Sequence, residues 1–196
     1  MKRSSLDQRP IIMALAGPNG AGKTTFYHAH LASSGLHYIS PDLLSRELDL
    51  EAYAAARMAD AIRRELLRQR ESFIFETVFS DPLGDKLAFM QEAVTQGTTV
   101  VLCFIGLDGP ALSEERVAMR VSQGGHDVPE EKIVARYPRT MANLGKAIRD
   151  LPHAEVYDNS DLHRPFRRIA EFAQGRRRFL ARRIPPWFRA VLEAQG

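Results

Sequence analysis

The sequence predicts an α/β fold in three layers, in which a mostly parallel sheet of about five strands is covered by helices on both faces. Short apolar runs alternate along the chain with longer segments of helical composition, as they do where helices connect parallel strands. The strand-like runs are apolar at nearly every position, which is typical of strands buried on both faces. With 196 residues, 44% of them hydrophobic, the chain suits one domain with a sizeable core.

Each predicted strand is a short apolar run that ends at glycine, proline or polar residues. The first, residues 11–16, leads into a glycine-rich turn. The strongest, residues 98–105, is β-branched and apolar almost throughout. The predicted strands are residues 11–16, 37–39, 73–76, 98–105 and 155–157.

The predicted helices lie between these strands and have recognisable ends. Pro41 favours the first turn of one helix, and Gly97 terminates another. Residues 51–70 are rich in alanine, arginine and leucine, which favours a long helix. The predicted helices are residues 23–32, a helix from 41, 51–70, 82–96, 113–121, about 128–149, and a helix from 164.

We divide the chain into three parts. Residues 1–10 are predicted to be a short disordered lead, and residues 11–163 the main domain. Within that domain, two helices joined by a glycine-containing hinge at about residues 113–140 resemble a closing lid. Residues 164–196 are predicted to form a basic, helical C-terminal extension.

The net charge of +3 is unevenly distributed. Residues 164–196 contain nine arginines and two glutamates, a net charge of +7, while residues 1–163 carry −4. An argument for nucleic-acid binding therefore depends on the C-terminal extension alone. We interpret this extension as an amphipathic helix with a solvated basic face, and we do not expect a nucleic-acid partner.

Composition also bears on the cellular compartment. The longest apolar run, residues 100–107, is much shorter than the roughly 18 residues of a membrane span. The N-terminus has no apolar stretch typical of a secretory signal. The single cysteine, Cys103, cannot form an internal disulfide and lies in the apolar segment VVLCFIG, which predicts a buried thiol. We expect a cytoplasmic protein without membrane contact.

Residues 17–24, GPNGAGKT, match the pattern G-x-x-x-x-G-K-[ST] at every constrained position. In such a loop the backbone N–H groups surround a phosphate, and the following helix adds its partial positive charge. Lys23 would reach the β- and γ-phosphates, and the Thr24 hydroxyl would bind Mg²⁺. The sequence therefore predicts a P-loop NTPase fold. ATP and Mg²⁺ would be held at Gly17, Pro18, Asn19, Gly20, Ala21, Gly22, Lys23, Thr24 and Thr25.

Two classes of P-loop protein are excluded by missing motifs. The chain lacks the N/T-K-x-D tetrapeptide with which GTPases read guanine, and it lacks an LSGGQ-like signature of ABC-type ATPases. What remains is a small kinase-like phosphotransferase. Such an enzyme needs an acceptor site, a group that accepts the hydroxyl proton, and cations that cover the transferred charge.

Carboxylates follow two of the predicted strands. Asp42 comes just after the second strand, at the sheet edge where ligands bind, and is the candidate base. Alternatively it caps the next helix or pairs with Arg46. Glu76 and Thr77 end the third strand. A carboxylate there is costly to bury alone, so Glu76 is expected to hold Mg²⁺ through water or to bind an acceptor hydroxyl.

Arginines flank the hinge of the predicted lid. Arg116 and Arg120 are one helical turn apart and share a face, and Arg136 and Arg139 follow the hinge. When the lid closes, these side chains would reach the phosphates. The alternative is a solvated helix face, paired with the glutamates at positions 114, 115, 130 and 131.

Taken together, these segments resemble the zeta toxins and zeta-toxin-like small P-loop kinases. The resemblance covers roughly residues 11–160 and is carried by ALAGPNGAGKTTF, YISPDLLSREL, FIFETVFS, GLDGPALSEERVAMRVSQGGHDVPEEKIVARYPRTMANL and VYDNS. The combination of F-x-F-E-T with R-V-x-x-G-G-H-x-V-P is more specific than the loop. The resemblance implies ATP- and Mg²⁺-dependent phosphorylation of a sugar hydroxyl of UDP-N-acetylglucosamine. It also implies a small helical antitoxin that blocks the nucleotide site.

The resemblance also implies roles for single residues. Lys23 and Thr24 match the nucleotide-binding lysine and hydroxyl. Asp42 matches the base, Glu76 a substrate-contacting acid, and Arg116 a phosphate-binding arginine of the lid.

Two positions match less closely. Asn159 falls where contacts on the adenine side usually lie. His126 stands where characterised toxins have a second arginine. Either His126 replaces that arginine, or Arg120 or Arg136 supplies the charge from another turn. We count Arg46, Thr77, His126 and Arg136 with Asp42 and Glu76 as candidate substrate-binding residues.

A second hypothesis belongs to another class of protein. It is a nucleotide-dependent ATPase or binding module whose basic C-terminal extension contacts nucleic acid or an acidic partner. This hypothesis predicts salt-dependent binding that is lost when residues 164–196 are removed.

Overall fold

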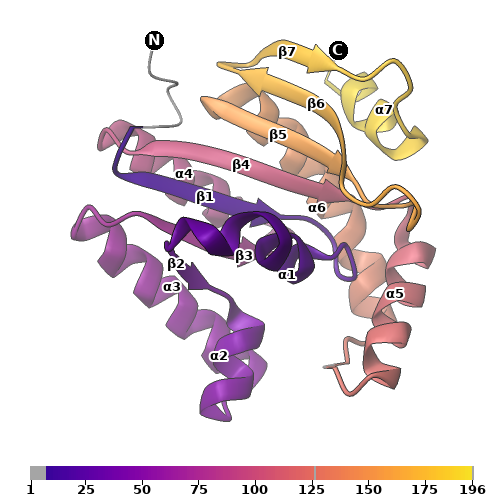
Figure 1. Cartoon of the computed structure of the whole chain (residues 1–196), viewed down its shortest axis with the longest axis horizontal. Helices are drawn as coiled ribbons and strands as arrows, with labels where there is room; N and C mark the ends of the chain where they lie inside the picture. The colour runs from indigo at the N-terminus through magenta and orange to yellow at the C-terminus, as the bar shows by residue number, and fades with distance from the viewer. Residues whose placement is uncertain (1–7, 126, 196) are drawn as a thin grey trace.

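A computed structural model describes residues 8–125 and 127–195. It contains a seven-stranded sheet in the order β2-β3-β1-β4-β5-β6-β7 (Figure 1). The strands are β1 (Ile11–Ala16), β2 (His37–Ile39), β3 (Phe73–Thr77), β4 (Thr99–Gly106), β5 (His153–Asp158), β6 (Arg167–Ala173) and β7 (Arg176–Leu180). The first five are parallel, and β6 and β7 pair antiparallel at one edge. The α/β prediction is confirmed, and the sheet formed by the described residues has seven strands rather than about five.

The helices are α1 (Lys23–Phe26), which continues into the π-helical turn η2 (Tyr27–Leu31) and the 3₁₀ turn η3 (Ala32–Ser34), then α2 (Pro41–Leu48), α3 (Ala52–Arg68), α4 (Asp85–Thr95), α5 (Pro110–Ser122), α6 (Glu130–Asp150) and α7 (Pro186–Glu193). Figure 1 shows α1 in front of the sheet and α4 and α6 behind it. The sheet is thus the middle layer of three.

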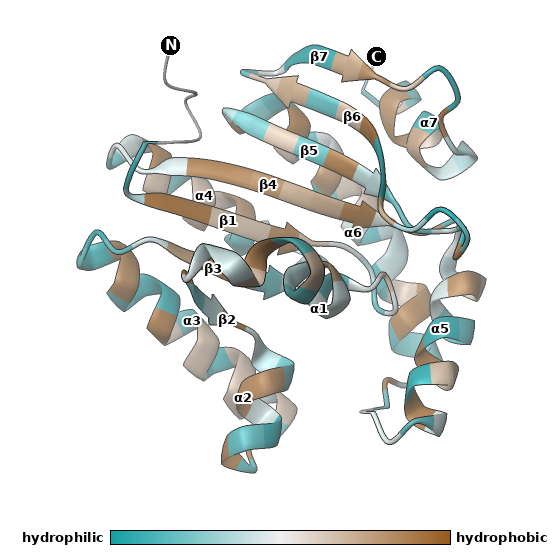
Figure 2. Cartoon of the chain, in the orientation of Figure 1, coloured by the Kyte–Doolittle hydropathy of each residue, from teal (hydrophilic) through white to brown (hydrophobic). Residues whose placement is uncertain are grey.

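The core has two parts, one on each face of the sheet. On one face, buried side chains of α3, α4, α6 and α7 pack against the sheet. On the other, Phe26 and Leu31 of the first helical segment pack on alternate residues of β4. The strands β1 and β4 are therefore apolar along most of their length, while much of β7 is hydrophilic (Figure 2). Within the described residues, no helix combines the length and the apolar character that crossing a membrane requires.

The helix predicted from residue 164 is wrong, because two strands and a short helix occupy this segment. Gln174 and Gly175 both have positive φ, the backbone of a tight turn that joins antiparallel strands. In β6, Ala170 and Phe172 point into the core, so this strand buries an apolar face that its arginines hide in the sequence. The interpretation of residues 164–196 as an amphipathic basic helix is therefore corrected.

The short helix α7 is also part of the core. Trp187 and Phe188 are buried, and the Trp187 ring lies against Gly106 at the end of β4. A Cβ on Gly106 would come within 2.2 Å of that ring. The Trp187 Nε1–H donates to Asp158 Oδ1 (3.1 Å), at the end of β5. The C-terminal segment thus packs directly against the carboxyl ends of the strands, where the glycine-rich loop also lies.

Candidate nucleotide and acceptor site

The glycine-rich loop joins the end of β1 to the start of α1, as the sequence predicts. Gly17 has a φ of 147°, and a Cβ there would lie 2.0 Å from the Ile105 carbonyl oxygen. Gly22 has a φ of 85°, and its Cβ would come within 2.9 Å of the Asn159 amide nitrogen. Both positions therefore require glycine for backbone conformation and for space.

Lys23 is buried on the inner side of the loop. Its ammonium donates to the carbonyl oxygens of Gly17 and Pro18, at 3.0 Å each, and lies 3.8 Å from Glu76 Oε1. Burial lowers the pKa of the Lys23 ammonium, and the carboxylates of Glu76 and Asp42 oppose that shift. A bound phosphate would supply further negative charge close to this cation.

Glu76, at the end of β3, accepts hydrogen bonds from two hydroxyl groups. Thr24 Oγ1 donates to Glu76 Oε2 over 3.0 Å, and the Tyr38 phenol donates to the same oxygen. Burial and the Glu76 carboxylate raise the pKa of the Tyr38 phenol, which therefore keeps its proton. Tyr38 is not among the residues predicted for the site, although it begins the segment YISPDLLSREL, because only Asp42 and Arg46 of that segment are assigned roles from the sequence.

A hydroxyl and a carboxylate are a suitable donor set for Mg²⁺. This cation prefers oxygen ligands and is usually held by one or two protein groups together with substrate phosphates and waters. Thr24 is exposed and Glu76 lies behind it, so the two residues predicted to hold the metal do lie together. Across residues 8–125 and 127–195, no three histidine, cysteine or acidic side chains gather into a metal site of their own.

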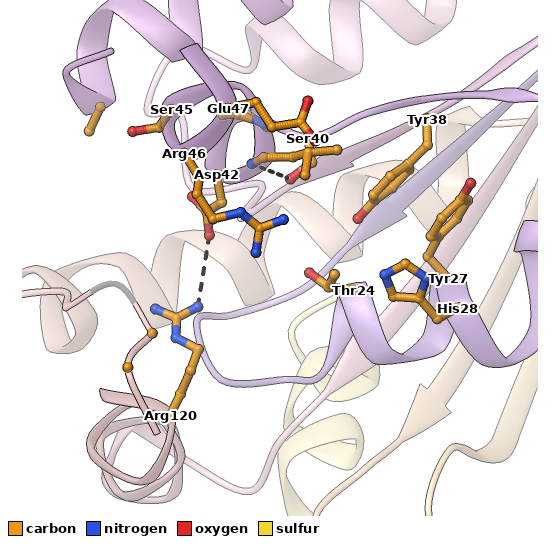
Figure 3. A pocket seen from close by; sticks show the side chains of 15 residues that line it. Thr24, Tyr27, His28, Tyr38, Ser40, Asp42, Ser45, Arg46, Glu47 and Arg120 are labelled. Atoms are coloured by element: carbon orange, nitrogen blue, oxygen red, sulfur yellow. Dashed lines mark hydrogen bonds and ion pairs between the residues drawn. The ribbon is translucent and has the colours of Figure 1, made fainter. Parts of the chain in front are cut away.

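Asp42 lies in the first turn of α2, at the wall of a cavity of about 1020 Å³. Ser40 caps this helix, accepting a hydrogen bond from the Leu43 N–H, so Asp42 does not serve as the cap. The ion pair of Asp42 is formed with Arg120 Nη1, at 3.8 Å, and not with Arg46 (Figure 3). In the described residues Asp42 therefore forms neither the helix cap nor the Arg46 ion pair.

The cavity extends from the glycine-rich loop towards the predicted lid. Its walls include Thr24, Tyr38, Asp42, Arg46 and Arg120 (Figure 3). Of the residues predicted to bind substrate, Asp42 and Arg46 line this cavity. Glu76 does not line it, but it accepts hydrogen bonds from Thr24 and Tyr38, which do. Thr77 accepts a hydrogen bond from the Phe79 N–H (3.0 Å) and shapes the loop after β3.

The structure separates the arginines around the hinge. Arg120 lines the cavity opposite Asp42. Arg116 donates to the carbonyl oxygens of Asn159 (3.5 Å) and Ser160 (3.3 Å), beside the glycine-rich loop. Arg136, on α6, does not line the cavity. His126 lies outside the described residues.

Asn159 is buried beneath the glycine-rich loop. Its amide donates to the Ala21 carbonyl oxygen (2.9 Å), and its amide oxygen accepts from the Phe166 N–H (3.2 Å). The side chain therefore links the loop to the segment between β5 and β6. A contact between Asn159 and adenine remains a prediction.

A glycine-rich loop between a buried strand and a helix, with Lys23, Thr24 and Glu76 around it, defines a P-loop nucleotide-binding protein. The AAA domain family matches residues 12–139, more than half of the chain, and the chain belongs to this family. A comparison with curated proteins finds no match.

Solved structures share the fold at low sequence identity. A chain of the AvrRxo1-ORF1:-ORF2 complex with ATP has a TM-score of 0.71 and 15% identity, over 98% of this chain and 65% of that one. A chain from the PezAT chromosomal toxin–antitoxin system of the human pathogen Streptococcus pneumoniae has a TM-score of 0.58 and 15% identity, over 99% and 80%. This chain thus spans less than two thirds of the length of the first of these neighbours.

Proposed function

We propose that this protein is an ATP-dependent kinase of the zeta-toxin type, which transfers the γ-phosphoryl group of ATP to a sugar hydroxyl of UDP-N-acetylglucosamine. One observation carries the proposal. Asp42 and Arg120 face each other at 3.8 Å across a cavity whose wall includes Thr24 of the glycine-rich loop. A base and a cation thus adjoin the site where the phosphates are expected, as phosphoryl transfer requires.

In the proposed reaction the acceptor hydroxyl lies next to Asp42. Asp42 accepts the hydroxyl proton while the oxygen forms a bond to the γ-phosphorus. The bond between that phosphorus and the oxygen bridging to the β-phosphate breaks, and ADP leaves with that electron pair. Arg120 and Lys23 cover the charge on the transferred group. Mg²⁺, held through Thr24 with help from Glu76, would supply further positive charge at the phosphates.

In this scheme Arg120 can bind either of two anions, the Asp42 carboxylate or the γ-phosphate of ATP. In the structure it pairs with Asp42, and both side chains are partly exposed, at 38% and 62%. ATP would bring a more highly charged anion, so Arg120 would move to the γ-phosphate and release Asp42 to act as base. Closure of the predicted lid, which consists of residues 113–140, would accompany this exchange.

The proposal also names an acceptor molecule and a partner protein. Similarity to the zeta toxins supports a nucleotide sugar, and the large cavity has room for one. The PezAT neighbour, named as part of a toxin–antitoxin system, supports an antitoxin as partner, and the resemblance to the zeta toxins implies that it is small and helical. A cytoplasmic location would give the enzyme access to both ATP and nucleotide sugars.

The proposal is tested with purified protein, ATP, Mg²⁺ and a panel of nucleotide sugars, followed by phosphorus NMR. We expect ADP and a new phosphomonoester signal on UDP-N-acetylglucosamine, and no such signal with Lys23→Ala. Phosphorylation of a different acceptor would overturn the sugar assignment alone. If every acceptor stays unmodified while ATP binds, the kinase assignment is wrong.

A further inference from the structure

Three contacts link four side chains behind the glycine-rich loop, and the backbone of the first helical segment completes the ring. Thr24 and the Tyr38 phenol both donate to Glu76 Oε2. The Tyr38 ring stacks on Tyr27, with centroids 3.7 Å apart and planes inclined by 6°. Tyr27 follows Thr24 by three residues in the same helical segment, which closes the ring.

The ring determines which way the Thr24 hydroxyl points. A hydroxyl has one hydrogen to donate and two lone pairs to offer. Because Glu76 takes the hydrogen, the lone pairs of Thr24 Oγ1 are left for a cation on its other side. Groups behind a metal ligand commonly orient it in this way.

Glu76 can orient Thr24 only if its own carboxylate is fixed. The Tyr38 phenol binds the same oxygen as Thr24 and thereby limits rotation of the carboxylate. The phenol in turn is fixed by its stack on Tyr27. Tyr27 begins the π-helical turn η2, a feature that often occurs at functional sites.

We propose that Tyr38 is a positioning residue for the magnesium–ATP site. Its phenol fixes Glu76, Glu76 holds the Thr24 hydroxyl with its lone pairs towards the metal, and Tyr27 holds the Tyr38 ring in place. The inference rests on the proposed function, because it assigns Tyr38 to the Mg²⁺-dependent binding of ATP. Tyr38 also lines the cavity, so direct contact with the acceptor is the rival role.

The test compares ATP binding in Mg²⁺ with ATP binding in EDTA, measured by titration calorimetry. Tyr38→Phe keeps the stacked ring and removes only the hydroxyl. We expect its ATP affinity in Mg²⁺ to fall by about tenfold, the smaller end of the loss seen when a group behind a metal ligand is removed. Its affinity in EDTA should equal that of the unmodified protein. Mn²⁺ titrations followed by electron paramagnetic resonance should show the same loss.

The chain offers a matched control. Tyr157 on β5 also donates its phenol to a carboxylate, that of Glu155 at 2.5 Å, away from the cavity. Tyr157→Phe should leave both ATP affinities unchanged. Tyr27→Leu, which removes the stack and keeps the Tyr38 phenol, should give a smaller loss in Mg²⁺ of about threefold.

A double-mutant cycle separates the proposed role from general damage. Glu76→Gln should lower the Mg²⁺-dependent affinity, and adding Tyr38→Phe should lower it little further, because both changes interrupt one chain of contacts. If the unmodified protein binds ATP equally with and without Mg²⁺, the proposed function itself is contradicted. If the unmodified protein needs Mg²⁺ to bind ATP and the Tyr38→Phe variant has the same ATP affinity in Mg²⁺, only the role of Tyr38 is overturned. A rise in acceptor KM alone would also overturn that role.

Discussion

The nucleotide half and the acceptor half of the site meet at Thr24 but are built differently. Around the loop, Lys23, Glu76 and Asn159 are between 4% and 8% exposed, and each has defined partners. Across the cavity, Asp42 and Arg120 are 62% and 38% exposed and share one ion pair. The nucleotide half is therefore formed before any ligand binds, whereas in the proposed reaction the acceptor half would be completed by its substrates.

This difference implies different consequences of mutation. A change in the acceptor half should alter the rate and leave the fold intact, because exposed ion pairs contribute little to stability. A change in the nucleotide half should alter stability and binding together, because it leaves buried polar groups without partners. Four predictions test this division, starting with the largest effect.

Asp42→Asn should lower kcat by about 10³-fold, because the amide cannot accept the acceptor proton. The melting temperature and the ATP affinity should stay close to those of the unmodified protein, since Asp42 is exposed and lies on α2. Steady-state kinetics, calorimetry and thermal unfolding measure the three quantities. If the variant also melts several degrees lower, Asp42 contributes to the stability of the fold, and the prediction is wrong.

Arg120→Ala should lower kcat by about 10²-fold, because one cation is removed from the transferred phosphoryl group. Arg136→Ala is the matched control on α6, and its kcat should change by less than about threefold because Arg136 does not line the cavity. The same assay measures both variants. Equal losses would show that Arg136 matters as much as Arg120 and would contradict the specific assignment of Arg120.

Asn159→Ala should destabilise the protein by about 2 kcal/mol, because the Ala21 carbonyl and the Phe166 N–H lose their partner. For a chain of this length that corresponds to a fall in melting temperature of roughly 4–8 °C. ATP affinity should fall with it, since the loop loses its support. Weakened ATP binding without any change in melting temperature would instead indicate a direct contact with the nucleotide.

Cys103 should resist alkylation in the folded protein, which tests whether the strand beneath both halves stays closed. Burial raises the pKa of the Cys103 thiol, so the group remains a thiol at pH 8 to 9, where an unfolded cysteine is partly ionised. Iodoacetamide should label the protein rapidly in urea and hardly at all in its absence, as read by mass spectrometry. Complete labelling of the native protein would mean that β4 becomes exposed during the reaction with iodoacetamide.

The sequence predicted the nucleotide half much better than the rest. The strand, loop and helix of residues 11–26 follow from local rules on glycine, apolar runs and helix starts, and the structure agrees with them. The rule for parallel sheets alone predicted correctly that Asp42 lies at the carboxyl ends of the strands. These features depend on neighbours in sequence, or on a rule that holds for all parallel sheets.

The features that sequence reasoning missed depend on contacts between distant segments. Tyr38 reaches Glu76, 38 residues further along the chain, and no spacing rule indicates that approach. In residues 164–196, arginines are frequent on the exposed positions of both strands, so the alternating apolar face of β6 was hidden. The tight turn at Gln174-Gly175 was the local signal that could have indicated a hairpin.

The contacts of Trp187 also determine when the site can be completed during synthesis. Gly106 and Asp158, which Trp187 touches, end the strands that support the glycine-rich loop. The loop itself lies some 165 residues before Trp187 in the chain. A ribosome releases these parts in order, so the nascent chain has its loop long before it has this support. Translation thus separates the appearance of the nucleotide-binding residues from their final assembly. For an enzyme proposed to have an antitoxin partner, that interval would give the partner time to bind first.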